Sequence, residues 1–311
     1  MISHNRIAAA VALAVYLVLS ATDAYAWGPA THVQLAHEML AQLALLPAAV
    51  AGILSRYTAD FLFGNIAADV VFAKKKTRVK QICHRWPTGL ALLEQARSDS
   101  GRAFAYGYLS HLAADTVAHN KFIPHQAILN GSTKNFGHLY WELRADLCVD
   151  PQYWTTLRAY VGRRFEEHEA HMASRLTGTL LSFENNLRVF HRLNNLVSRN
   201  GFRKSITVWD RLSRYDLCAH LVDRYRRESL DRIHCVLANG ANSVFIDEDP
   251  NGNHALKMIR LHRMHARRRA RRRCPVSPRL TALIEAYAPS PKLRPLLPTS
   301  PEMMPAARAA G

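Results

Sequence analysis

Three side chains that bind metals recur at intervals of four residues in the segment YLSHLAADTVAHN, where they are His111, Asp115 and His119. Residues four apart share one face of an α-helix, so the pattern predicts a helix with a carboxylate between two imidazoles. The row spans roughly 12 Å, so one ion cannot easily reach both histidines, whereas Asp115 could serve ions on either side. His138 and Glu142 repeat the interval. Because imidazole and carboxylate are good zinc ligands, these rows predict a multi-zinc centre.

Helical periodicity predicts an all-α fold along nearly the whole chain, since alternating strand patterns are scarce. We expect Thr31 to be the N-cap of a helix over residues 32–46, and Asp69 to lie in a turn of small residues at 64–69. Further helices are expected over residues 87–98, 101–120 and 134–148. The pattern in residues 151–199 predicts two more helices or one kinked helix. The pattern in residues 209–239 predicts another two helices. Asn239-Gly240 and the segment 249–252 are typical of turns.

The first 26 residues are typical of a secretory signal peptide. Arg6 supplies a positive charge, residues 7–20 are apolar, and residues 24–26 (Ala-Tyr-Ala) fit a cleavage site. The apolar stretch is short for a membrane span, which needs about 20 residues. We therefore expect an exported protein, periplasmic or secreted, that is cleaved after Ala26 and starts at Trp27; an uncleaved anchor is the alternative. Export permits disulfides, but the five cysteines leave at least one thiol unpaired within a monomer.

Positive charge is concentrated near the end of the chain. The formal net charge is +17, and residues 257–273 hold nine Lys and Arg and no acidic residue. Such a block is usually a solvated tail, but it would also attract anionic lipid headgroups. Nucleic-acid binding is less favoured because no aromatic residues interleave the arginines. We expect a helical domain over residues 27–256 and a basic, Pro-rich tail over residues 257–311, disordered from residue 289 onwards.

Three further short segments add candidate ligands. WGPATH (27–32) places Trp27 and His32 at the expected new N-terminus, GNIAAD (64–69) ends in Asp69, and CHRW (83–86) contains His84. Taken in order with the two helical rows, these segments resemble the zinc-dependent phospholipase C family. That family has a helical fold related to single-strand nucleases of the S1/P1 type and to the N-terminal domain of glycosylphosphatidylinositol-specific phospholipase D. The resemblance covers roughly residues 27–150.

The resemblance implies two or three zinc ions. In the family, the mature N-terminal tryptophan binds zinc through its own amine and carbonyl. Carried over to this chain, the family pattern implies that one zinc is held by Trp27, His32 and Asp115. A second would be held by Asp69, His84 and His111, with Asp115 as a bridge to the first. A third would be held by His119, His138 and Glu142. The short interval between Asp115 and His119 is that of the phospholipase D-like branch, and His125 is the substitute for His119.

Each ligand candidate also has an ordinary interpretation when it is taken alone. Asp69 could cap a helix, Trp27 could be a core aromatic, and a lone histidine–aspartate pair is more often a surface pair. Their joint order favours a metal centre. Asp146, one turn after Glu142, is expected at most to support a ligand. The remaining histidines are interpreted as structural or solvated: His37, His168, His171, His191, His220, His234, His254, His262 and His265.

A multi-zinc centre suits phosphodiester hydrolysis, because paired metals neutralise phosphate charge and activate water. The resemblance therefore implies a hydrolase of the phospholipase C type that acts on membrane phospholipids. Asp69 is the candidate general base and Asp115 the central carboxylate. Alternatives are an S1/P1-type nuclease, for which the positive charge gives some support, a phospholipase D-like enzyme, and a non-catalytic zinc protein of the cell envelope. No protein partner is inferred.

Overall fold

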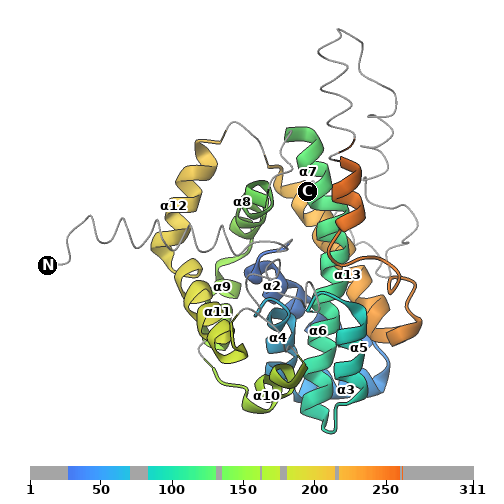
Figure 1. Cartoon of the computed structure of the whole chain (residues 1–311). Coiled ribbons are helices and arrows are strands. Elements are labelled where there is room, and N and C mark those ends of the chain that lie inside the picture. The colour runs from blue at the N-terminus through green and yellow to red at the C-terminus, as the bar shows by residue number, and fades with distance from the viewer. Residues whose placement is uncertain are drawn as a thin grey trace, which may run out of the picture.

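The computed structural model describes residues 27–70, 83–130, 135–161, 163–175, 181–213, 217–259 and 261. Within these ranges the chain is α-helical and contains no strand, which confirms the all-α prediction (Figure 1). The expected signal peptide, Cys274 and nearly all of the basic tail lie outside the described residues. Helical residues 253–259 run past residue 256 and bury Ile259, so the packed part of the chain reaches at least that residue.

In chain order, the helices up to residue 239 are α2 (Pro29–Leu40), α3 (Ala48–Arg56), α4 (Thr58–Ala67), α5 (Trp86–Glu94), α6 (Asp99–Val117), α7 (Ile123–Asn130), α8 (Asn135–Leu147), α9 (Pro151–Val161), α10 (Glu166–Arg175), α11 (Phe183–Val197), α12 (Asn200–Arg211) and α13 (Ala219–Asn239). Short 3₁₀ turns, η1 (Leu43–Leu45) and η4 (Gly240–Asn242), follow α2 and α13, and a π-helical turn, η3 (Ala118–Phe122), joins α6 to α7. None of the described helices is long and apolar enough to cross a membrane.

The predicted start of α2 was wrong. The helix begins at Pro29 with Gly28 as the N-cap, so Thr31 lies inside it. Proline suits the first helical position because its φ is fixed near the helical value and its missing N–H would have no partner there. The cap comes from another helix, because the Asp146 carboxylate of α8 accepts hydrogen bonds from the backbone amides of Ala30 and Thr31.

Other boundaries also moved. The first helix, which was expected to continue to residue 46, ends at Leu40 and is followed by the short turn η1. The expected turn at 64–69 is mostly helix, because Gly64 to Ala67 belong to α4, and α3 was not predicted. Residues 151–199 form three helices, α9 to α11, and α12 begins at Asn200, earlier than expected. The turns at Gly240 and Gly252 are confirmed, with φ of 54° and 59°.

Helix α6 is the centre of the fold. It packs against α4, α5 and α13, and nearly every residue from Ala103 to Val117 is buried (Figure 1). Its closest approach is to α4, where Gly64 faces Gly107: a Cβ on Gly107 would overlap the carbonyl oxygen of Phe61, and one on Gly64 would overlap that of Phe104. Glycine at both positions therefore allows the two backbones to touch, one turn before His111.

We expect Gly107→Ala to lower the free energy of unfolding by about 2 kcal/mol, because the added methyl must separate α4 from α6. Gly52→Ala is the matched control: it is also a helical glycine, but its added Cβ has no atom within 4 Å. There the change should stabilise by roughly 0.5–1 kcal/mol, through helix propensity alone. Urea unfolding measures both, and equal effects of the two substitutions would contradict the close helix contact.

Candidate metal centre

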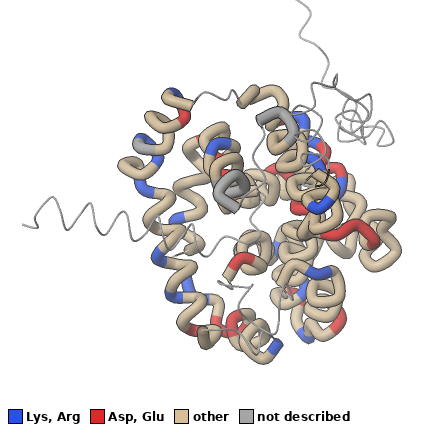
Figure 2. Tube along the Cα trace, turned by 45° about the horizontal axis from the view of Figure 1, so that its top comes forward, with Lys and Arg blue, Asp and Glu red and all other residues tan. Residues whose placement is uncertain are grey.

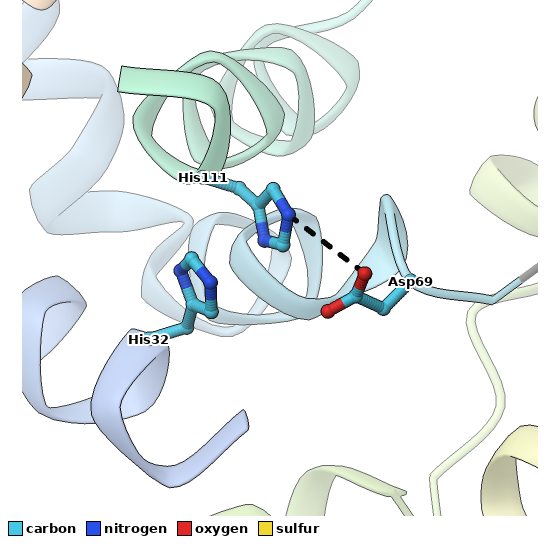
Figure 3. Close-up of side chains that lie close together, drawn as sticks. All are labelled: His32, Asp69 and His111. Atoms are coloured by element: carbon cyan, nitrogen blue, oxygen red, sulfur yellow. Dashed lines mark ion pairs between the residues drawn. The ribbon is translucent and has the colours of Figure 1, made fainter. Parts of the chain in front are cut away.

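Four parts of the chain deliver five side chains to one buried cluster. His32 comes from α2, Asp69 directly follows α4, and His84 precedes α5. His111 and Asp115 come from neighbouring turns of α6. Figure 3 shows the side chains of His32, Asp69 and His111 lying close together from three separate segments. The structure therefore brings together candidate ligands that are up to 83 positions apart, from His32 to Asp115.

Asp115 lies in the middle of the cluster, with imidazole nitrogens around both of its oxygens. Its Oδ2 lies 3.2 Å from His111 Nε2 and 3.4 Å from His84 Nε2. The same oxygen lies 3.9 Å from His119 Nε2, one turn further along the chain. Its Oδ1 lies 3.3 Å from His32 Nε2. One carboxylate thus faces four histidines, which is the arrangement that a shared ligand requires.

Asp69 adds a second carboxylate to the same group. Its Oδ1 lies 3.2 Å from His84 Nε2 and 4.0 Å from His111 Nε2, while those two imidazole nitrogens are 3.1 Å apart. The rings of His32 and His111 are stacked, with centroids 3.9 Å apart. Two groups of three residues place their possible ligand atoms within 4.8 Å of one another. The first group is His32, Asp69 and His111, and the second is His84, His111 and Asp115.

The electrostatics of the cluster fit a bound cation. These side chains are all buried, and two buried carboxylates are costly without positive charge beside them. Burial opposes ionisation of Asp115, yet the neighbouring His111 holds the pKa of this carboxyl well below its usual value. Against the effect of burial, Asp115 and Asp69 raise the pKa of His111. Positive charge beside these carboxylates is therefore favoured, and a metal ion would supply it.

The imidazoles are also prepared as ligands. His111 Nδ1 donates to the backbone oxygen of Asn65 at 2.8 Å, which leaves Nε2 to face the cluster. Burial, with His111 nearby, lowers the pKa of His32, which favours the neutral form that binds metals. Its Nδ1 is buried without a hydrogen-bond partner. Asn65 was not among the predicted site residues, because its part is played by a backbone oxygen that the sequence does not distinguish.

His119, rather than its alternative His125, lies in the cluster. His119 is buried in the π-helical turn η3 that continues α6. Single π-helical turns inside helices occur frequently at functional sites. His125 points elsewhere, with its Nδ1 2.9 Å from the hydroxyl oxygen of Tyr225 on α13. The shorter interval after Asp115 is therefore the one whose histidine reaches that carboxylate.

The side chain of Trp27 is fully buried. Its indole stacks on Phe122, with ring centroids 4.8 Å apart, and Nε1 donates to Ser229 Oγ at 3.1 Å. The backbone of the next residue, Gly28, accepts a hydrogen bond from the amide of His32. The side chain thus fixes the start of α2, and the ligand role expected for this residue involves its main chain only.

Glu142 is buried on α8, while His138 belongs to the same helix and its side chain lies outside the described residues. Asp146, one turn after Glu142, holds the N-terminus of α2 and hence the helix that carries His32. Burial raises the pKa of Asp146 to about 6 although three hydrogen bonds to Ala30 and Thr31 favour the charged form. A Cβ on Gly28 would overlap this carboxylate, so the glycine permits the contact.

A turn late in the chain clamps two of the ligand-bearing segments together; we call residues 249–252 the 249–252 clamp. Asn251 Nδ2 donates to the backbone oxygen of His84 at 2.7 Å, and Asn120 Nδ2 donates to that of Asp249 at 2.8 Å. Gly252, with φ of 59°, lies so close to the carbonyl of His119 that no Cβ would fit. The sequence showed the turn but not what it touches.

Another buried histidine, His168, lies in a group that has the geometry of a structural contact. His168 Nε2 lies 2.6 Å from Asp60 Oδ1 and 3.3 Å from Ser100 Oγ. One nitrogen therefore faces both partners, whereas a catalytic serine–histidine pair uses one nitrogen for the serine and the other for the acid. His168 also stacks on Phe104, with centroids 4.5 Å apart. This group joins α4, α6 and α10, as expected for a structural histidine.

The helical fold and the buried histidine–carboxylate cluster are those of an all-α protein whose interior is able to bind metal ions. A family model described as zinc dependent phospholipase C matches residues 31–192, over half of the chain. The chain therefore belongs to the zinc-dependent phospholipase C family. The match extends beyond the resemblance seen up to residue 150, through most of α11, and begins after Trp27. No curated protein and no solved structure matches the chain.

Substitution of Asp115 and substitution of Glu142 should change the zinc content of the protein by different amounts. Because Asp115 faces four histidines, Asp115→Asn should lose more than one zinc per molecule. Glu142→Gln, on another helix, should chiefly affect one. Elemental analysis of the dialysed proteins measures this directly. Equal losses of a single ion from both variants would count against sharing at Asp115.

The clamp should matter for zinc retention as well as for stability. We expect Asn251→Ala to weaken zinc binding by roughly tenfold, because loss of the hydrogen bond to His84 loosens a ligand segment. Asn194→Ala is the matched control: Asn194 is also buried and donates to a backbone oxygen, that of Phe190 at 3.0 Å, far along the chain on α11. Chelator competition and thermal unfolding separate the effects. If both variants lose the same stability and neither loses zinc affinity, the clamp has no part in holding the site.

Proposed function

We propose that this protein is a zinc-dependent phosphodiesterase of the phospholipase C type that hydrolyses membrane phospholipids. The observation that carries the proposal is the convergence of four imidazoles on one buried aspartate, in a chain of the zinc-dependent phospholipase C family. A phosphodiester is strongly anionic, and a polynuclear cationic centre is suited to neutralising it. The family supports hydrolysis, and the cluster supports a metal requirement.

We assign two or three zinc ions to this centre, shared through Asp115. The proximity of His32 Nε2 to Asp115 Oδ1 supports one ion on that side, completed by the main chain of Trp27 once the leader is removed after Ala26. His84 and His111 on the other oxygen support a second. His119, His138 and Glu142 would complete a third. This assignment requires cleavage directly before Trp27 and therefore export to the periplasm or the exterior.

When bound, zinc would polarise the phosphate and lower the pKa of water toward ~7. The protein itself would hold the ligand side chains in position and accept a proton from water. Asn65 and the 249–252 clamp fix the direction of His111 and the position of His84. We propose that Asp69 takes the proton from the attacking water, because it is a buried carboxylate at the edge of the imidazole group and follows the C-terminus of α4.

Hydrolysis of a phospholipid panel by the purified mature protein tests this function. We expect diacylglycerol and a phosphorylated headgroup as products, and Asp69→Asn should lower turnover at least a hundredfold, as for loss of a general base. Asp60→Asn is the matched control, since Asp60 also contacts a histidine, His168, and should leave turnover close to that of the unmodified protein.

The other candidate functions give different results in the same assay. Release of phosphatidic acid would replace C-type with D-type cleavage. Turnover of single-stranded DNA alone would indicate the nuclease, which the net charge of +17 favours. Zinc retention without cleavage of any phosphodiester would overturn an enzymatic function.

A further inference from the structure

Three of the seven exposed large hydrophobic residues in the described part of the chain lie on helix α12 and its C-cap, Leu212. Val208 is 56% exposed, Trp209 is 37% exposed and Leu212 is 79% exposed. Val208 and Leu212 are four residues apart, and Lys204 precedes them by the same interval, so the three share one exposed side of the helix. Isolated exposed apolar residues are common, but a contiguous set of them on one helix marks an interaction surface.

The inner side of the same helix is firmly attached to the fold. Trp209 packs edge-on against Tyr140 of α8, with centroids 4.8 Å apart, and Asp210 pairs with Arg144 of α8. Arg203 lies over the ring of Trp154, 5.0 Å from its centroid. Helix α12 therefore packs on α8, the helix that carries the candidate ligand Glu142.

Positive charge is concentrated in this part of the molecule (Figure 2). Helix α11 leads into α12 through two residues, and the exposed cations on the two helices are Arg188, Arg192, Arg199, Lys204 and Arg211. The exposed acid among them, Glu184, is paired with Arg188. Figure 2 shows Lys and Arg along this edge, at the left of the view, with few acidic residues. We call these cations with Val208 and Leu212 the α11–α12 face.

We infer that the α11–α12 face binds an anionic lipid bilayer, with Val208 and Leu212 inserted among the headgroups and the cations contacting lipid phosphates. Cationic and aliphatic residues on one amphipathic helix are the combination that lies in a membrane interface. The inference rests on the proposed function and deepens it, because it names the surface that brings the enzyme to its substrate. It also differs from the basic tail, which begins at residue 257.

Two other occupants fit this face less well. Single-stranded nucleic acid needs aromatic platforms, and the outermost residues here are aliphatic, while Trp209 is less exposed and packs edge-on against Tyr140. A second copy of the chain in a two-fold dimer would bring like charges together across the contact. A bilayer accepts both the charges and the aliphatic side chains.

Vesicle flotation with the full-length mature protein tests the inference. The vesicles are phosphatidylcholine alone or with one third phosphatidylglycerol, and binding is measured on ice at about 0.1 M and about 0.5 M salt. Val208→Ser/Leu212→Ser should weaken binding to the anionic vesicles roughly tenfold at both salt concentrations, because salt does not screen apolar contacts. Lys204→Glu/Arg211→Glu should weaken it roughly tenfold at the lower salt only.

Matched controls separate the face from general charge and hydrophobicity. Val244 and Leu45 are 76% and 46% exposed on other elements, so Val244→Ser/Leu45→Ser removes comparable apolar surface. Arg224→Glu/Arg227→Glu on α13 changes the net charge by the same amount as the α12 pair. Both controls should bind vesicles like the unmodified protein, and every variant should keep its zinc content and its turnover of a soluble phosphodiester.

Several results would overturn the inference. Equal losses from Lys204→Glu/Arg211→Glu and its charge control, with no loss from Val208→Ser/Leu212→Ser, would show that net charge alone directs binding. Loss of single-stranded DNA binding, or of a dimer in sedimentation, with vesicle binding unchanged would assign the face to nucleic acid or to a second copy. Failure of the proposed function is distinct, because it would appear as absent turnover in the unmodified protein with lipid binding intact.

Discussion

Negative charge buried at the C-terminal end of α6 is the constraint on which the rest of the structure depends. Asp115 has almost no solvent contact, and Asp69 lies in the same interior. A buried carboxylate without compensating charge is costly enough that it normally takes up a proton. Here the surrounding imidazoles instead hold the pKa of Asp115 low, so the carboxylate stays ionised in the protein interior. An interior arranged in this way gives a stable place to a divalent cation.

The helices around α6 act as a frame for that charge. The paired glycines bring α4 against α6, which sets Asp69 and the carbonyl of Asn65 beside His111. Asp146 fixes the start of α2, and with it His32. The 249–252 clamp holds the segments of His84 and His119 from the far end of the chain. These contacts come from regions distant in sequence, so the site exists only in the completed fold.

Local spacing made part of this structure predictable. The interval of four between His111, Asp115 and His119 is a property of a single helix, so it indicated both the helix and its ligand face. The cap of α2 was not predictable in the same way, because the capping oxygen belongs to Asp146, more than a hundred residues away. Asn251 and Gly252 form a recognisable turn, but the contacts that give them a role with His84 and His119 are tertiary. The outer face of α12 was likewise hidden, since its mixed composition resembles that of a partly buried helix.

Anomalous diffraction at the zinc edge from crystals of the mature protein tests the shared-carboxylate centre most directly. We expect at least two zinc peaks inside the cluster, both in contact with Asp115, at the roughly 2.0–2.2 Å typical of zinc–oxygen bonds. His84 and His111 should bind one of these ions and His32 another. A cluster without zinc, or a single ion bound away from Asp115, would contradict a centre shared through this carboxylate.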